Sequence, residues 1–268
     1  ILETGGTKKW SNSVMKNSTN QRYLVTGTGL KLIQDNVGKK AMTEPKTLQD
    51  FVSYCATNYP ANRNALILWD HGSGSLGGFG YDTLFPSSGS MTIDEINLAL
   101  TGAGVKFDFI GFDACLMATL ETAYMLNKHA DYMIASEETE PGIGWYYTDW
   151  LSDLSDNTSL DTETLGKMII NDYVAKCSSM VPSQTTTLSL IDLVALNNQV
   201  DKAFRSFANS TNGQLDSDYK VVSNARGDAR EFGQAKLDQV DLVDLAKNID
   251  SMEATALINA LDQCIVYN

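Results

Sequence analysis

Two short apolar segments of this chain each end in polar residues that can carry chemistry. Residues 65–72 (ALILWDHG) end in a His-Gly pair, and residues 107–115 (FDFIGFDAC) end in Asp-Ala-Cys. Apolar runs of this length are typical of buried strands in a parallel sheet. The chain has only two histidines and four cysteines. One residue of each kind directly after a predicted strand therefore constrains both the fold and the chemistry.

The rest of the chain alternates β-rich runs with stretches of helical periodicity. Strands are predicted at 22–25, 65–70, 107–112, 131–136 and 186–191, and helices at 47–58, 92–100, 116–128, 148–154, 161–177, 193–209, 217–225, 241–250 and 252–263. Thr47, Thr92 and Asp192 are predicted to cap helices. Alternation of this kind predicts an α/β fold with a mainly parallel β-sheet flanked by helices on both faces.

The organisation along the chain predicts a single domain that covers residues 1–268. No internal repeat, low-complexity segment or linker interrupts it. Residues 1–6 have the pattern of a strand that is ending, and residues 264–267 that of a strand just beginning. The domain is therefore expected to lack an N-terminal strand and some C-terminal elements.

Composition excludes several classes of function. The net charge of −13 argues against a nucleic-acid surface, which needs a basic stripe. This charge is compatible with a cationic substrate or simply with solubility. No apolar run approaches the roughly 20 residues of a membrane span. The four cysteines are widely spaced without a Cys-x-x-Cys pair, which disfavours a structural zinc site and excludes a dense disulfide framework.

A thiol and an imidazole at the ends of two strands are what a cysteine hydrolase needs. Ligands of open parallel sheets bind beyond the carboxyl ends of the strands, so His71 and Cys115 face one cleft if their strands are neighbours. A helix that begins at Cys115 would favour the thiolate through its dipole. The backbone N–H groups of Gly72 and Cys115 are candidates for an oxyanion hole. A lone cysteine is usually a small buried hydrophobe, but the joint placement favours catalysis.

Asp113 lies two residues before Cys115, where its carboxylate can line the same cleft. A carboxylate beside a nucleophilic thiol raises the pKa of that thiol, so we expect it to have a use, such as binding a lysine or arginine side chain. Glu137, Glu138 and Glu140 follow the strand predicted at 131–136. They either add to this pocket or are solvated loop charges.

Residues 72–77 (GSGSLG) match the G-x-G-x-x-G pattern of dinucleotide-binding loops. That fingerprint needs a helix that starts inside the glycines and an acidic residue at the end of the next strand. Here the chain continues as GFGYD, which indicates a loop. The match therefore does not support a dinucleotide site.

The two strand-end segments resemble those of the clostripain-like cysteine peptidases, a family related to caspases, legumains and gingipains. The similarity is carried by residues 66–72 (LILWDHG), 111–118 (GFDACLMA), 135–142 (ASEETEPG) and 44–51 (EPKTLQDF), and more loosely by 229–233 and 240–242. The resemblance implies a caspase-like sandwich, with His71 as general base and acid and Cys115 as the acylated nucleophile. It also implies an S1 pocket that holds Arg or Lys at P1, with Asp113 as its determinant and Ser136 and Glu138 as further candidates.

The resemblance carries further expectations. It implies a secreted or cell-envelope bacterial endopeptidase that takes peptides with a basic P1, and it allows a calcium requirement, although no calcium loop of defined spacing is present. Members of the family commonly cleave themselves between the catalytic His and Cys. Lys106 is the only basic residue there and lies just before a predicted strand, so the protein is expected to act unprocessed or to be activated elsewhere. A companion chain from processing stays an open alternative. Two rival functions remain: a catalytically silent binding module and a cysteine hydrolase of non-peptide amides.

Overall fold

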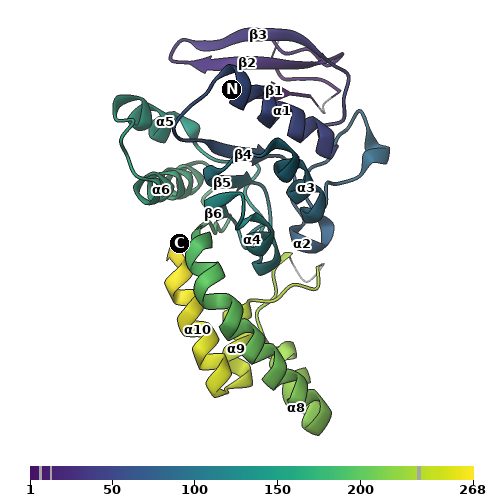
Figure 1. The fold of residues 1–268 in the computed structure, drawn as a ribbon, viewed down its shortest axis with the longest axis vertical. Helices are drawn as coiled ribbons and strands as arrows, with labels where there is room; N and C mark the ends of the chain where they lie inside the picture. The colour runs from purple at the N-terminus through teal and green to yellow at the C-terminus, as the bar shows by residue number, and fades with distance from the viewer. Residues whose placement is uncertain (6–7, 13, 234–236) are drawn as a thin grey trace. The chain divides into compact units, whose positions relative to one another are not determined.

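The computed structural model describes residues 1–5, 8–12, 14–233 and 237–268 (Figure 1). The chain divides into two compact units. The first comprises Ile1–Asn64 and Trp69–Lys106, and the second comprises Ala65–Leu68 and Phe107–Asn268. The single domain expected over residues 1–268 stays a prediction.

The first unit contains a three-stranded antiparallel sheet. Its strands are β1 (Leu2–Thr4), β2 (Asn20–Thr26) and β3 (Gly29–Gly38), in the order β1-β2-β3. β2 contains the strand predicted at 22–25, and Tyr23 on it is 1% exposed. β3 was not predicted, because its residues are mostly exposed or half-buried and mix polar and apolar side chains without a strict period of two.

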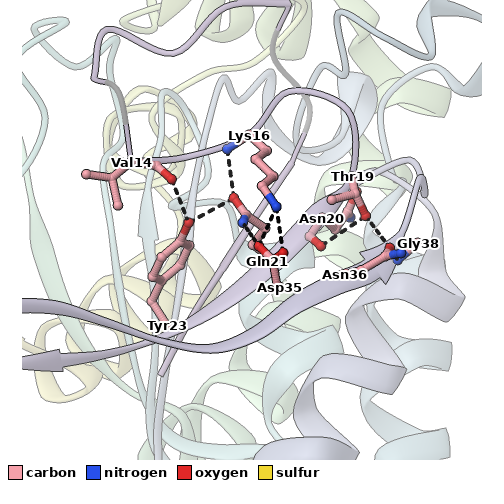
Figure 2. A network of polar contacts seen from close by, with 9 residues as sticks. All are labelled: Val14, Lys16, Thr19, Asn20, Gln21, Tyr23, Asp35, Asn36 and Gly38. Carbon is pink, nitrogen blue, oxygen red and sulfur yellow. Dashed lines mark hydrogen bonds and ion pairs between the residues drawn. The ribbon is translucent and has the colours of Figure 1, made fainter.

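A network of polar side chains ties the segment before β2 to this sheet (Figure 2). Gln21, which is 1% exposed, lies at its centre. Its Oε1 accepts hydrogen bonds from the Lys16 backbone at 2.7 Å and the Tyr23 hydroxyl at 2.8 Å, and its Nε2 donates to Asp35 at 2.7 Å. The Lys16 ammonium also binds Asp35 and lowers the pKa of that carboxyl. The buried amide is thus satisfied at both ends, as stability requires.

The helical elements of the first unit are α1 (Pro45–Asn58), α2 (Gly74–Gly77), η1 (Pro86–Ser88) and α3 (Ile93–Ala103). Thr92 caps α3 as predicted, in a capping box with Glu95. The cap predicted at Thr47 is wrong. α1 begins two residues earlier, with Glu44 as its N-cap, because Pro45 is well suited to the first turn of a helix.

The second unit contains a five-stranded sheet. Its strands are β4 (Ala65–Trp69, with Ala65–Leu68 in this unit), β5 (Phe107–Asp113), β6 (Ala130–Ala135), β7 (Ser189–Asp192) and β8 (Ile265–Tyr267), in the order β4-β5-β6-β7-β8. β5 and β6 are parallel, whereas β7 is antiparallel to both β6 and β8. The α/β fold is confirmed, but the sheet is mixed rather than mainly parallel. Side-chain pattern reports burial, not strand direction, so the sequence could not show this reversal.

The remaining helices belong to the second unit. They are α4 (Leu120–Leu126), α5 (Tyr147–Asp156), α6 (Thr162–Met180), α7 (Leu193–Ala195), the π-helical turn η2 (Leu196–Val200), α8 (Asp201–Asp228), α9 (Leu242–Ile249) and α10 (Met252–Cys264). Asp192 caps α7 as predicted. α8, α9 and α10 pack against one another, in green and yellow in Figure 1. The two helices predicted at 193–209 and 217–225 are largely one helix, α8, which is kinked at Asp218.

A hydrophobic core joins the sheet of the second unit to α5 and α6. It is built from Phe109, Ile134, Trp145, Trp150, Leu165, Ile169, Ile170, Tyr173, Cys177, Leu188 and Leu190. Burying aromatic and aliphatic side chains of this size is the dominant favourable contribution to folding. In the described parts of the chain, no helix combines the length and apolarity that crossing a membrane requires.

Candidate active site

His71 is exposed and lies on the loop after β4, from which Asp70 separates it. Its carbonyl accepts the Gly80 N–H at 2.8 Å, and the next residues pair through the bridges Gly72–Phe79 and Phe79–Met91. Gly78 enables this pairing: its φ is +78°, and a Cβ there would lie 2.5 Å from the Met91 carbonyl oxygen. Only glycine fits such a conformation without strain. Backbone hydrogen bonds thus fix the loop that carries the His71 imidazole.

Cys115 lies on a tight turn that follows β5. The next residue, Leu116, has a φ of +65°, an uncommon left-handed conformation for a side chain of this size. The half-buried thiol accepts the backbone N–H of Glu140 at 3.3 Å. This contact holds the sulfur against the backbone of Glu140.

The sequence predicts that a helix dipole activates the Cys115 thiol, and the structure shows that this prediction is wrong. The helix predicted to begin at Cys115 is α4, and it begins at Leu120, with Thr119 as its N-cap. Leu116 and Ala118 instead donate to the carbonyls of Glu138 and Ser136, at 3.1 and 2.9 Å. The dipole of α4 therefore does not act at Cys115, since the effect is confined to the first turn of a helix.

Asp113 is the last residue of β5 and is 3% exposed. Both carboxyl oxygens accept the backbone N–H of Trp145 at 3.2 Å, and Oδ2 also accepts the Tyr147 hydroxyl at 2.8 Å. Burial raises the pKa of Asp113, against the lowering effect of these donors. The carboxyl thereby anchors residues 144–147, where a Cβ on Gly144 would lie 3.0 Å from Oδ1.

Glu140 lies beside both Asp113 and Cys115. Its backbone contacts the thiol, and its Oε1 accepts the Trp145 indole N–H at 3.3 Å. Burial and the neighbouring Asp113 raise the pKa of Glu140 to about 9. The sequence offered Glu140 only as one of three loop glutamates. The contact with Asp113 joins positions 27 apart in the chain, and no local pattern encodes it.

The side chains of Ser136 and Glu138 both form hydrogen bonds with other groups of the protein. The Ser136 side chain is fully buried, with its Oγ 2.9 Å from the Glu138 carbonyl and 2.8 Å from the Thr187 hydroxyl. The Glu138 carboxylate accepts the N–H groups of Thr139 at 2.8 Å and Gly233 at 3.1 Å. The structure brings these two residues together with Asp113, Cys115 and Glu140 in the second unit, while His71 and Gly72 belong to the first.

The two backbone donors expected in the oxyanion hole have no partner within the described protein. The N–H groups of Gly72 and Cys115 donate to no other described residue. Throughout the described residues, no group of three or more His, Cys, Asp or Glu side chains could hold a metal ion.

Solved structures of two proteases share this fold. A secreted C11 cysteine protease from Bacteroides thetaiotaomicron, in complex with an irreversible peptide inhibitor, superposes with a TM-score of 0.69 over 94% of this chain and 72% of its own, at 19% identity. An inactive zymogen C11 protease from Parabacteroides distasonis gives 0.67 over 92% and 68%, also at 19% identity. The architecture is therefore the caspase-like α/β fold of these proteases.

Sequence comparison gives the family. The clostripain family profile matches residues 16–268. Clostripain from Hathewaya histolytica is 31% identical over 123 residues, which cover 40% of this chain but only 23% of clostripain. The matched stretch thus spans less than a quarter of that relative. The chain belongs to the clostripain family of cysteine peptidases, which confirms the resemblance seen in the strand-end segments.

Proposed function

We propose that this protein is a cysteine endopeptidase that hydrolyses peptide bonds after Arg or Lys, with Cys115 as nucleophile and His71 as general base and acid. Family membership supports the reaction class. The observation that carries the assignment is the Cys115 turn, which offers a half-buried sulfur a backbone N–H donor beside two buried carboxyl groups.

The chemistry follows from these roles. His71 takes the Cys115 proton, and the thiolate attacks the scissile carbonyl carbon to give a tetrahedral oxyanion. The N–H groups of Gly72 and Cys115 stabilise that oxyanion, a contribution worth several kcal/mol in other enzymes. The imidazolium protonates the departing amine and leaves a thioester. His71 then deprotonates a water that attacks the thioester, which releases the acid and restores the thiol.

The preference for a basic P1 residue is assigned to Asp113. Its carboxyl lies two residues from the nucleophile in a buried setting, where attraction to a cation is stronger than in water. Ser136 and Glu138 shape the wall of this pocket, because their backbone carbonyls accept the N–H groups of Ala118 and Leu116 and hold this segment against the Cys115 turn.

Export and processing belong to the same proposal. The matched Bacteroides thetaiotaomicron protease is described as secreted and the Parabacteroides distasonis protease as an inactive zymogen. By analogy, this chain is secreted or acts in the cell envelope and is activated by processing, which can yield a companion chain.

The test is hydrolysis of fluorogenic peptides that differ only at P1, with Arg, Lys, Asp or Leu. We expect turnover after Arg and Lys alone. Cys115→Ala should abolish it, whereas Cys55→Ala, which removes a half-buried thiol on α1, should leave it intact. Binding without turnover in the wild type would identify a silent binding module. Turnover with no advantage for basic P1 groups would favour a hydrolase of other amides.

A further inference from the structure

Glu140 has a carboxyl oxygen for which the protein supplies no donor. Oε1 accepts the Trp145 indole N–H, but Oε2 is buried and has no hydrogen-bond partner in the described parts of the chain. A buried carboxylate oxygen without a donor is costly. The neighbouring group is the carboxyl of Asp113, and two carboxyls can share a hydrogen bond only when one of them carries a proton.

The proton of this pair belongs on Glu140. Asp113 receives the Trp145 N–H and the Tyr147 hydroxyl, and such donors favour its ionised form. Glu140 receives only the indole N–H. The pKa of about 9 that burial and Asp113 give to Glu140 agrees with this geometry. The pair therefore holds one proton and one negative charge at neutral pH.

No cation among the described residues neutralises the pair. The titratable groups that face it are Tyr147 from α5, Tyr173 and Cys177 from α6, and Cys115 from the turn. All four are acids, and burial raises the pKa of the first three. The surroundings therefore leave one negative charge beside the nucleophile, ready for a cation from outside.

We propose that the proton shared by Asp113 and Glu140 in the free protein occupies the place of the substrate's basic P1 side chain, and that binding of that side chain expels it. This inference rests on the proposed function. The proton leaves to solvent, both carboxyls become ionised, and the P1 cation takes its place, so the pocket carries one net negative charge before and after. Glu140 is then a second specificity-determining residue, whose Oε2 receives its donor only from the substrate.

The exchange is tested with two peptide aldehydes that differ only at P1, arginine against its uncharged isostere citrulline. The arginine side chain stays charged over the whole pH range. Both aldehydes react with the same thiol, so any pH dependence that comes from the thiol cancels in the ratio of the two inhibition constants. We expect the preference for arginine to rise about tenfold per pH unit between about pH 6 and 8 in the wild type. It should be independent of pH in Glu140→Gln. Glu121→Gln, an exposed change in the first turn of α4, should behave as the wild type.

Calorimetry of the wild type in two buffers of different ionisation enthalpy gives a readout that does not depend on any variant folding. We expect the arginine aldehyde to release one more proton than the citrulline aldehyde. Equal release, or a pH-dependent preference in Glu140→Gln, overturns the exchange and leaves the peptidase assignment standing as long as arginine is preferred. No preference for arginine at any pH overturns both.

Discussion

The loop that carries His71 and the turn that carries Cys115 are built in different ways. The His71 loop carries an exposed histidine and is fixed by backbone pairing that depends on Gly78. The Cys115 turn lies against residues 136–140, and the buried carboxyl of Asp113 anchors the stretch that follows them. The first region is therefore sensitive to an added Cβ. The second depends on the protonation of buried acids.

The largest expected effect is on catalysis at the His71 loop. His71→Ala should lower kcat about 10³- to 10⁴-fold, because general acid–base catalysis by a positioned imidazole is lost. The thermal midpoint should not change, since His71 is exposed. His129, the other histidine, is 7% exposed, so His129→Ala should lower the midpoint. A wild-type rate in His71→Ala would remove it from the mechanism.

The second prediction concerns the backbone of the same loop. Gly78→Ala should destabilise the protein by about 3 kcal/mol or more, because strain at positive φ adds to a clash with the Met91 carbonyl. Gly89→Ala is the matched control: Gly89 has almost the same backbone angles, φ 69° and ψ −164° against φ 78° and ψ −165°, but no atom lies near its Cβ position. Denaturant unfolding of both variants separates clash from strain. Equal losses would show that the Met91 contact is unimportant.

The third prediction tests the pH sensitivity of the Cys115 region. The folded pKa of Glu140 lies above its unfolded value, so the folded state binds more protons and stability falls as pH rises from about 5 to 9. Relative to Glu140→Gln, the free energy of unfolding of the wild type should fall by up to about 1.4 kcal/mol per pH unit. Urea titrations at pH 6, 7 and 8 measure this. Parallel curves for the two proteins would refute the raised pKa.

The sequence predicted the strands and helix caps that depend on local residue patterns. It did not predict the strand directions or the contacts between residues that are distant in the chain. Apolar runs predicted β4, β5 and β6, and side-chain chemistry predicted the caps at Thr92 and Asp192. The antiparallel β7 and the late start of α4 were missed, because connections and turn geometry decide them. The Cys–His dyad stays a prediction. The sequence offered Glu140 as one of three glutamates that could add to the Asp113 pocket, but it could not single out the Asp113–Glu140 pair, since residues distant in the chain create it only in the folded state.

The smallest expected effect is a loss of stability at Ser136, in the segment 136–140 that is hydrogen-bonded to the Cys115 turn. Ser136→Ala removes a buried hydroxyl that bridges the Glu138 carbonyl and Thr187, and should cost about 1–2 kcal/mol of stability. Ser217→Ala, which removes an exposed hydroxyl on α8, should cost less than about 0.5 kcal/mol. If the bridge also holds the Cys115 turn in place, Ser136→Ala should slow alkylation of the thiol or turnover as well as lower stability. Lost stability with an unchanged rate would show that the turn keeps its geometry without the bridge, through its own hydrogen bonds to residues 136–140.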